Sequence, residues 1–138
     1  MKKKIFVLCM VVCLLVTISV PAYAALPAPG IEPMAEYHFS SKASLTISSG
    51  GVAEATGKIV GLTGVTTKTT VHLYLQRYED GEWVDIADWI SSNNSVNTTL
   101  VKTKSVDKGY TYRAKASCYA YCGSDYERVI RYSAEIDF

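Results

Sequence analysis

The chain has 138 residues, of which 49% are hydrophobic and 11% aromatic, and its formal net charge is +1. That length suits one domain with a single core. The near-neutral charge, without a basic stripe or an acidic tail, argues against nucleic acid and anionic membrane surfaces as partners.

The first 24 residues predict a signal peptide. Lys2 to Lys4 precede an apolar run over residues 5–20, and Ala22-Tyr23-Ala24 is a small-residue cleavage pattern. The alternative is a retained N-terminal anchor, but the 16-residue run is short for a membrane-spanning helix. Cleavage leaves 114 residues with eleven basic and thirteen acidic side chains. We therefore expect a secreted, extracellular protein whose mature chain does not insert stably into a membrane.

Residues 25–34 contain three of the four prolines and no periodic pattern, which predicts an extended leader or linker. Residues 35–138 carry short runs of alternating apolar and polar positions, which predict one β-sandwich domain. The first strand is expected over about residues 36–48 and the second over residues 52–60. One face of the second strand has small residues, which predict close approach by a neighbouring strand or a large side chain: Ala53, Ala55 and Gly57.

The third strand, expected over residues 69–78, shows the clearest alternation. Asp80-Gly81 follows at once and predicts a two-residue hairpin turn, because both central positions of such a turn take a positive φ. This turn pairs Glu79 with Glu82, the first residue of a fourth strand over residues 82–90.

Extending this register predicts three core pairs: Leu75–Ile86, Val71–Ile90 and Leu73–Asp88. The last pair sets an apolar side chain against a charged one, which points to a register slip at that position. The opposite face receives four pairs: Tyr78–Trp83, Gln76–Asp85, Tyr74–Ala87 and His72–Trp89.

These pairs form an aromatic strip, and its rings are our candidate ligand-binding residues: Tyr74, Tyr78, Trp83 and Trp89. Flat aromatic strips on a sheet stack on sugar rings or anchor protein partners. There are three structural alternatives. The strip is a cross-strand ladder that only stabilises the hairpin, it is covered by the leader, or a bulge turns Trp83 into the core.

The fifth strand, over about residues 96–105, has few apolar residues and is expected near a sheet edge. The sixth and seventh strands are expected around residues 110–118 and 130–136, where apolar and polar positions alternate. Their expected core residues are even-numbered, so facing partners sum to an even number. A three-residue loop over residues 123–125 keeps this parity and predicts five pairs: Cys122–Tyr126, Cys118–Ile130, Ala116–Tyr132, Tyr112–Ile136 and Arg113–Glu135. A five-residue loop instead sets Lys115 against Arg131, an unfavourable like-charge pair.

Cys118 and Cys122 are the cysteines that remain after signal cleavage, and an oxidising compartment predicts a disulfide between them. Four residues of extended strand separate their Cα atoms by about 13 Å, whereas a bridge needs about 4.4–6.8 Å. The disulfide therefore requires the sixth strand to break after Cys118, and an unbroken strand requires free thiols. We favour the disulfide, because two free thiols are less common in a secreted protein.

Seven short strands in one secreted domain predict an antiparallel sandwich. Residues 106–116, VDKGYTYRAKA, resemble the sixth strand of fibronectin type III and immunoglobulin-like domains. In those families a turn glycine precedes a tyrosine whose hydroxyl binds back to the backbone, and the resemblance assigns that role to Tyr110 or Tyr112. The layout of Leu73 to Arg77, Trp83 and Gly109 to Arg113 also resembles small secreted proteins of unknown function from Gram-positive bacteria. The resemblance implies a fold and a location, but no catalytic residue.

Catalysis is not expected, because His38 and His72 lie on separate strands and no serine or cysteine nucleophile lies beside an oriented base. Two cysteines and two distant histidines form no recognisable zinc site, and we expect no metal or cofactor. The sequence predicts a secreted, non-catalytic binding module whose partner is an extracellular protein or a glycan. The alternative is a structural or self-associating extracellular protein whose edge strands pair between copies.

Overall fold

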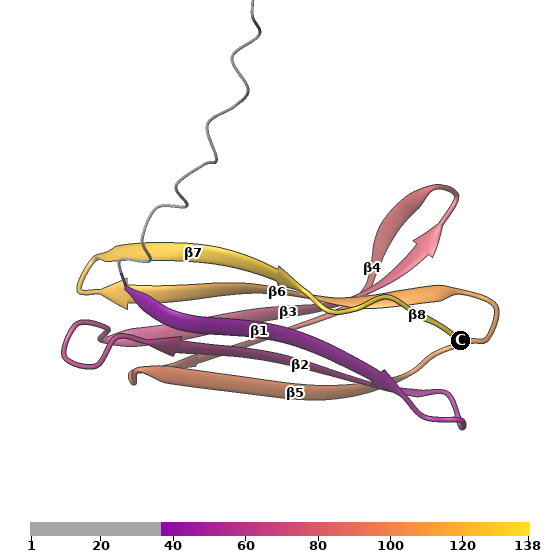
Figure 1. Cartoon of the computed structure of the whole chain (residues 1–138), viewed down its shortest axis with the longest axis horizontal. Coiled ribbons are helices and arrows are strands. Elements are labelled where there is room, and N and C mark those ends of the chain that lie inside the picture. The colour runs from indigo at the N-terminus through magenta and orange to yellow at the C-terminus, as the bar shows by residue number, and fades with distance from the viewer. Residues whose placement is uncertain (1–36) are drawn as a thin grey trace, which may run out of the picture. The chain divides into compact units, whose positions relative to one another are not determined.

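The strands expected from the alternating pattern are all present in the computed structural model, which describes residues 37–138 (Figure 1). In chain order they are β1 (His38–Ile47), β2 (Val52–Gly61), β3 (Lys68–Glu79), β4 (Glu82–Asn93), β5 (Asn97–Ser105), β6 (Thr111–Cys122), β7 (Asp125–Tyr132) and β8 (Ile136–Asp137). The predicted signal peptide, residues 1–24, and leader, residues 25–34, lie outside the described residues. Within the described part of the chain, no helix has the length and apolar character needed to cross a membrane.

The strands form two antiparallel sheets that pack face to face, which confirms the predicted all-β sandwich. Sheet A has the order β1-β2-β5, and sheet B has the order β4-β3-β6-β7, with the short β8 also pairing with β6. Strand β5 is an edge of sheet A, as predicted from its few apolar residues. The expected seventh strand is divided into β7 and β8, so the described part of the chain has eight strands.

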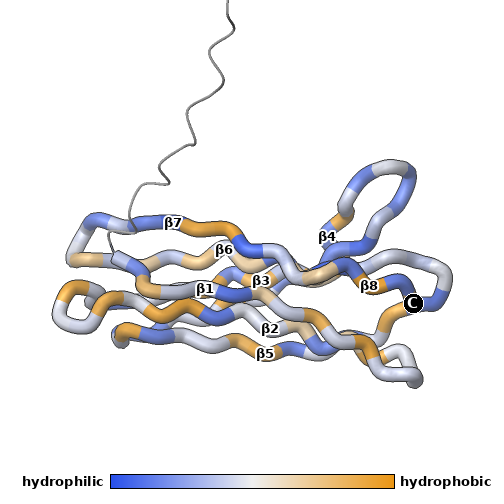
Figure 2. Tube along the Cα trace, viewed as in Figure 1, coloured by the Kyte–Doolittle hydropathy of each residue, from blue (hydrophilic) through white to orange (hydrophobic). Residues whose placement is uncertain are grey.

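The small residues of β2 let the two sheets approach closely, as predicted. Ala53 and Ala55 are buried, and a Cβ atom added to Gly57 would lie only 2.7 Å from Cγ1 of Val71 on the opposite sheet. Burial alternates from residue to residue along β2, and hydrophobic and hydrophilic positions are interspersed along β1 and β2 (Figure 2). The core between the sheets is completed by larger side chains, including Ile59, Leu73, Leu75 and Tyr112.

The β3–β4 hairpin confirms the predicted turn but not the whole predicted register. Asp80 and Gly81 both have positive φ, 50° and 87°, and the pairs Glu79–Glu82, Tyr78–Trp83 and Gln76–Asp85 form as expected. A β-bulge then shifts the register between Leu75 and Gln76, which leaves Ile86 as the extra residue. Figure 1 shows the end of this hairpin turning away from the body of the sandwich.

Beyond the bulge the predicted pairs are wrong by one residue. Five predicted pairs are replaced, because Leu75 faces Ala87, Tyr74 faces Asp88, Leu73 faces Trp89, His72 faces Ile90 and Val71 faces Ser91. The physical reason is the pair that the unbulged register sets in the core, Leu73 with Asp88. The bulge moves the Asp88 carboxylate to the outer face and brings the Trp89 ring against the core.

The closing hairpin also differs by one residue from the predicted register. Its turn is the two-residue Gly123-Ser124, so Cys122 faces Asp125 and Cys118 faces Val129. This register turns Val129 toward the core. Three predicted pairs are wrong for this reason: Cys122–Tyr126, Cys118–Ile130 and Ala116–Tyr132. A glycine with positive φ at the first central position, here Gly123 at 63°, is typical of a two-residue hairpin turn.

The predicted Tyr112–Ile136 pair does form, because residues 133–135 interrupt the strand and restore the parity in β8. Ser133 holds this interruption in place. Its N–H donates to the carbonyl oxygen of Ala114 at 2.9 Å, and its Oγ accepts from the Ala114 N–H at 2.8 Å. The predicted pairing of Arg113 with Glu135 is replaced by a hydrogen bond from Arg113 Nε to Gln76 Oε1, at 2.8 Å.

Tyr112 is the tyrosine that ties the corner before β6 to the backbone. Its side chain is completely buried, and its hydroxyl donates to the carbonyl oxygen of Asp107 at 2.8 Å. Tyr110, the other candidate, is 38% exposed. The structure therefore decides between the two tyrosines that the sequence left open.

Cys118 and Cys122 are both free thiols in the structure, so the favoured disulfide is not confirmed. Strand β6 runs unbroken from Thr111 to Cys122, which is the geometry that keeps the two sulfur atoms apart. Cys118 faces the core, and burial raises the pKa of its thiol to about 11. Cys122 lies at the end of the strand and is half-buried.

We expect the two thiols to differ sharply in reactivity, because only a thiolate that meets solvent reacts with an alkylating reagent. Iodoacetamide added to the folded protein, expressed without residues 1–24, should modify Cys122 and leave Cys118 free. In denaturant it should modify both. Mass spectrometry counts the added groups; a protein that takes up none without prior reduction would contain the disulfide after all.

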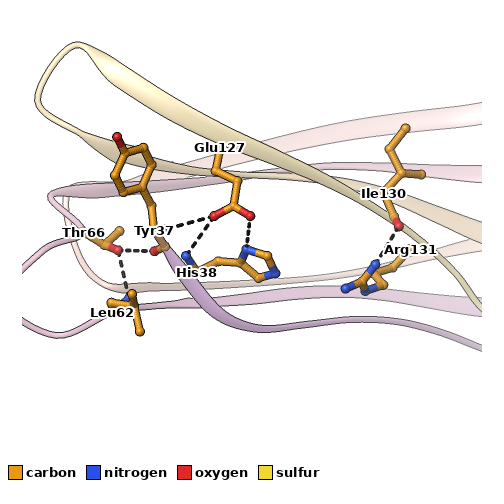
Figure 3. A network of polar contacts seen from close by, with 7 residues as sticks. All are labelled: Tyr37, His38, Leu62, Thr66, Glu127, Ile130 and Arg131. Atoms are coloured by element: carbon orange, nitrogen blue, oxygen red, sulfur yellow. Dashed lines mark hydrogen bonds and ion pairs between the residues drawn. The ribbon is translucent and has the colours of Figure 1, made fainter. Parts of the chain in front are cut away.

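A carboxylate on β7 joins the two sheets at their edge (Figure 3). Glu127 forms an ion pair with His38, with Oε1 and Nδ1 2.8 Å apart, and accepts a hydrogen bond from the Tyr37 N–H at 2.9 Å. The carbonyl oxygen of Tyr37 accepts in turn from the Thr66 hydroxyl and from the Leu62 N–H. This network fixes the start of β1 against β7 and against the loop after β2.

We expect the Glu127 network to make stability depend on pH. Burial alone raises the pKa of Glu127, but hydrogen bonds from His38 and Tyr37 and the charge of His38 outweigh it, so the pKa lies below its ordinary value. A carboxyl whose pKa is lowered by folding contributes stability above its unfolded pKa, and this contribution is lost as the pH falls through the folded pKa.

The urea midpoint of the wild-type protein should therefore fall more steeply below about pH 4.5 than that of Glu127→Gln. Glu54→Gln, which removes an exposed carboxylate outside the network, is the matched control and should follow the wild type. Parallel curves for all three proteins would show that the network has no such role.

Candidate functional site

The outer face of sheet B, which points away from sheet A, gathers most of the aromatic side chains of the domain. Directly paired residues of neighbouring strands point to the same face of a sheet. Lys68, Tyr121 and Tyr126 form one such row across β3, β6 and β7. We call this surface the tyrosine face and define it by its seven rings: Tyr74, Tyr78, Trp83, Tyr119, Tyr121, Tyr126 and Tyr132.

Three of the four predicted site residues lie on the tyrosine face, and one does not. Tyr74 and Tyr78 point outward from β3, and Trp83 faces Tyr78 from β4 with the ring centroids 5.2 Å apart. Trp89 lies beyond the bulge and packs against the core opposite Leu73. The bulge that we considered for Trp83 is thus present, but it turns Trp89 inward instead.

One end of the tyrosine face is a cluster of three tyrosines. The ring centroids of Tyr119, Tyr121 and Tyr126 lie 5.6–6.4 Å from one another, in stacked and tilted arrangements. The ammonium group of Lys68 lies over the Tyr121 ring at 5.1 Å. Tyr126 is 59% exposed, so this cluster offers a ring surface to solvent.

The middle of the tyrosine face is a polar chain. The Tyr74 hydroxyl lies 2.8 Å from His72 Nδ1, and His72 Nε2 lies 3.3 Å from the Asp88 carboxylate. Lys115 places its ammonium group over the Tyr74 ring at 4.8 Å. Burial raises the pKa of the Tyr74 phenol, and the negative charges of Asp85 and Asp88 raise it further, so the phenol stays protonated at neutral pH.

At the other end, a cation is held between two rings. The Arg113 guanidinium lies 4.0 Å from the Trp83 centroid and 4.4 Å from the Tyr132 centroid. Its Nε donates to Gln76, whose amide group donates in turn to Asp85 at 2.6 Å. Gln76 is only 5% exposed. This chain of contacts fixes the orientation of the Trp83 ring.

The paired rows of the tyrosine face carry more positive than negative charge. Four cations point outward among the rings: Lys68, Arg113, Lys115 and Arg128. Three carboxylates point outward on the same face: Asp85 and Asp88 from β4, and Asp137, which pairs with Thr111 of β6. The four cations therefore outnumber the carboxylates by one, and they lie on β3, β6 and β7 among the rings.

Sequence reasoning missed four of the seven rings. Tyr119 and Tyr121 occupy odd positions of β6, which the predicted alternation already turned outward, but nothing in the sequence says that β6 lies beside β3. Tyr126 and Tyr132 fell on the wrong faces, because the assumed loop was one residue too long. The Gly-Ser pair at 123–124 is the signal that favours the shorter turn.

We found no protein-family model, no curated protein and no solved structure that matches this chain. Within residues 37–138, no three or more His, Cys, Asp or Glu side chains come together in a way that would hold a metal ion. The geometry of the tyrosine face is therefore the basis for a functional proposal.

Proposed function

We propose that the protein is a secreted, non-catalytic binding module that uses its tyrosine face to bind an extracellular glycan. The observation that supports this proposal is the collection of seven aromatic rings on one face of one sheet. Three of the rings are substantially exposed, with Tyr78 at 45%, Tyr126 at 59% and Tyr132 at 51%. Exposed rings stack on the apolar faces of sugars, while their hydroxyl groups bond to water or to sugar hydroxyls.

The charges on the face favour an acidic glycan. Lys68 and Lys115 place their ammonium groups over the rings of Tyr121 and Tyr74, and Arg128 is exposed on the same face. Groups of this kind bind carboxylates or phosphates on a polymer. We therefore propose a polysaccharide that carries such groups.

Several features support the absence of a catalytic role. The Tyr74 phenol has a raised pKa, which opposes its action as a nucleophile at neutral pH, and the Cys118 thiol is buried with a raised pKa. Both histidines are paired with carboxylates, His38 with Glu127 and His72 with Asp88. The first pair joins β1 to β7 across the two sheets, and the second joins the neighbouring strands β3 and β4.

The proposed type of sandwich is that of immunoglobulin-like and fibronectin type III domains. Two observations support it: a three-stranded sheet faces a larger sheet, and a buried tyrosine at the start of β6 binds back to the preceding turn. Modules of this type bind ligands on an open sheet face or on loops, which agrees with the location of the tyrosine face. Secretion, predicted from residues 1–24, would bring this face into contact with extracellular polymers.

Affinity electrophoresis in gels that contain polysaccharide tests the proposal. Polygalacturonate, which is acidic, should retard the protein more strongly than a neutral β-glucan. Replacing Tyr119 and Tyr126 together by alanine should weaken binding by about tenfold or more, since the aromatic residues that dominate a binding site cost about 2 kcal/mol or more each when truncated. Phe39→Ala removes an exposed ring from sheet A and is the matched control. Equal mobility of all proteins in all gels would refute glycan binding.

The alternative proposal, self-association through an edge strand, rests on a different observation. The second half of β5, from Val101 to Ser105, is exposed on both of its sides and forms an edge of sheet A. Lys102 and Lys104 oppose such pairing by mutual repulsion between copies. Light scattering distinguishes the proposals: a molecular mass that rises with concentration supports self-association, and a constant monomer mass excludes it.

A further inference from the structure

A cavity of about 370 Å³ opens between the end of the β3–β4 hairpin and the last residues of the chain. Its lining residues come from β3, β4, β6 and β8 and from the interruption before β8: Tyr78, Trp83, Thr111, Glu135 and Asp137. The two rings form one wall, and the β8 side supplies the carboxylates. The register explains this juxtaposition, because Asp137 pairs with Thr111 while Trp83 pairs with Tyr78.

The lining has two carboxylates and no cation. Asp137 Oδ1 accepts a hydrogen bond from the Thr111 hydroxyl at 2.6 Å, which fixes its orientation. Glu135 is exposed, and its side chain makes no hydrogen bond or ion pair with any other described residue. The cavity therefore combines an aromatic wall with negative charge that the described side chains leave unpaired.

We propose that this cavity binds an organic ammonium group, as carried by choline, by an amino sugar or by a lysine side chain. Aromatic faces attract cations through the ring quadrupole, and a carboxylate beside the ring adds a direct charge interaction. The indole of Trp83 already accepts one cation, since the Arg113 guanidinium lies 4.0 Å from its centroid. An anion is disfavoured here because both ionisable groups of the lining are carboxylates.

Arg113 does not occupy the cavity itself. Its guanidinium lies between Trp83 and Tyr132, and its Nε is bonded to Gln76, so it is committed to the tyrosine face. The cavity shares Tyr78 and Trp83 with one end of the tyrosine face, but its carboxylates give this end the opposite charge preference to the part of the face that carries Lys68, Lys115 and Arg128. Its ligand is a cation, whereas the proposed glycan is an anion, and the inference stands independently of glycan binding.

Choline and its uncharged isostere 3,3-dimethylbutan-1-ol provide the test. In a Trp89→Phe background Trp83 is the only tryptophan, so its fluorescence and its indole NMR signal report on the cavity. Choline should shift both signals saturably, and the isostere should not. Equal responses to the two compounds would show a merely apolar pocket, and no response to choline would show that the cavity holds no ammonium; either result overturns the proposal.

Two variants locate the effect. Glu135→Gln removes one charge without breaking any contact and should weaken choline binding severalfold, and more so at low salt. Tyr126 lies at the far end of sheet B, so Tyr126→Ala should leave choline binding unchanged. If Tyr126→Ala weakens choline as much as Glu135→Gln does, the binding site is not this cavity. A variant that loses polysaccharide binding but keeps choline binding, or the reverse, shows that glycan binding and ammonium binding can fail separately.

Discussion

Replacing Tyr112 by alanine is expected to lower the free energy of unfolding by about 3–5 kcal/mol, the usual cost of removing a large buried aromatic ring. The ring is completely buried in the core between the two sheets. The backbone of Tyr112 pairs with Arg77 of β3 on one side and with Ile136 of β8 on the other. A small domain has only about 5–15 kcal/mol of stability in total. The variant should therefore unfold at a much lower urea concentration.

Tyr112→Phe separates the hydroxyl from the ring. This variant keeps the ring but loses the hydrogen bond to the Asp107 carbonyl, which should cost about 1 kcal/mol. Tyr110→Phe is the control, because that tyrosine is partly exposed and its hydroxyl has no such bond. A larger loss for Tyr110→Phe than for Tyr112→Phe would show that the corner has been assigned to the wrong tyrosine.

The second large effect is expected at Gly57, where a single methyl group should lower the free energy of unfolding by about 1–3 kcal/mol. The added Cβ of Gly57→Ala would meet Val71 Cγ1 at 2.7 Å and the Ala116 Cβ at 3.3 Å. Both neighbours belong to sheet B, so the strain can be relieved only by moving the two sheets apart or by shifting buried side chains.

Gly50→Ala is the matched control for this prediction. Its added Cβ would meet no atom closer than Ser48 Oγ at 3.8 Å, which is ordinary contact, so its unfolding midpoint should stay close to that of the wild type. Urea denaturation measures both variants. If Gly57→Ala is as stable as Gly50→Ala, the sheets do not pack as closely at this point as the structure indicates.

The alternating pattern was sufficient to predict the all-β sandwich, the Asp80-Gly81 turn and the edge position of β5. It was sufficient because the side chains of a half-buried strand point alternately to the core and to solvent, so apolar and polar residues alternate with a period of two. The order of strands in each sheet could not be predicted, because no local signal says that β6 lies between β3 and β7. The tyrosine face depends on that order, so only three of its seven rings could be predicted.

The register errors have a common physical cause. Parity counting assumes an uninterrupted ladder, and one inserted or omitted residue reverses every later assignment. In β4 the extra residue is Ile86, and in the closing hairpin the turn is one residue shorter than assumed. The first error hid the inward position of Trp89, and the second placed Tyr126 and Tyr132 on the wrong faces. The only sign of a register error in the sequence was an unfavourable pair, Leu73 facing Asp88.

The cysteines show how a general tendency yields to a specific geometry. Secreted proteins favour disulfides, but Cys118 and Cys122 lie on one continuous strand that pairs with both β3 and β7. Breaking that strand to form a short bridge would remove ladder hydrogen bonds on both sides. The backbone pairing therefore outweighs the stabilisation of a very small loop.

Amide NMR with an acidic oligosaccharide is the most direct test of the tyrosine face as the ligand-binding surface. Titration of the labelled protein with oligogalacturonate should shift amide signals of β3, β6 and β7, with the largest changes around Tyr74, Tyr119 and Tyr126. The signals of β1, β2 and β5 should stay in place. Shifts confined to sheet A, or no saturable shift at any position, would contradict the account.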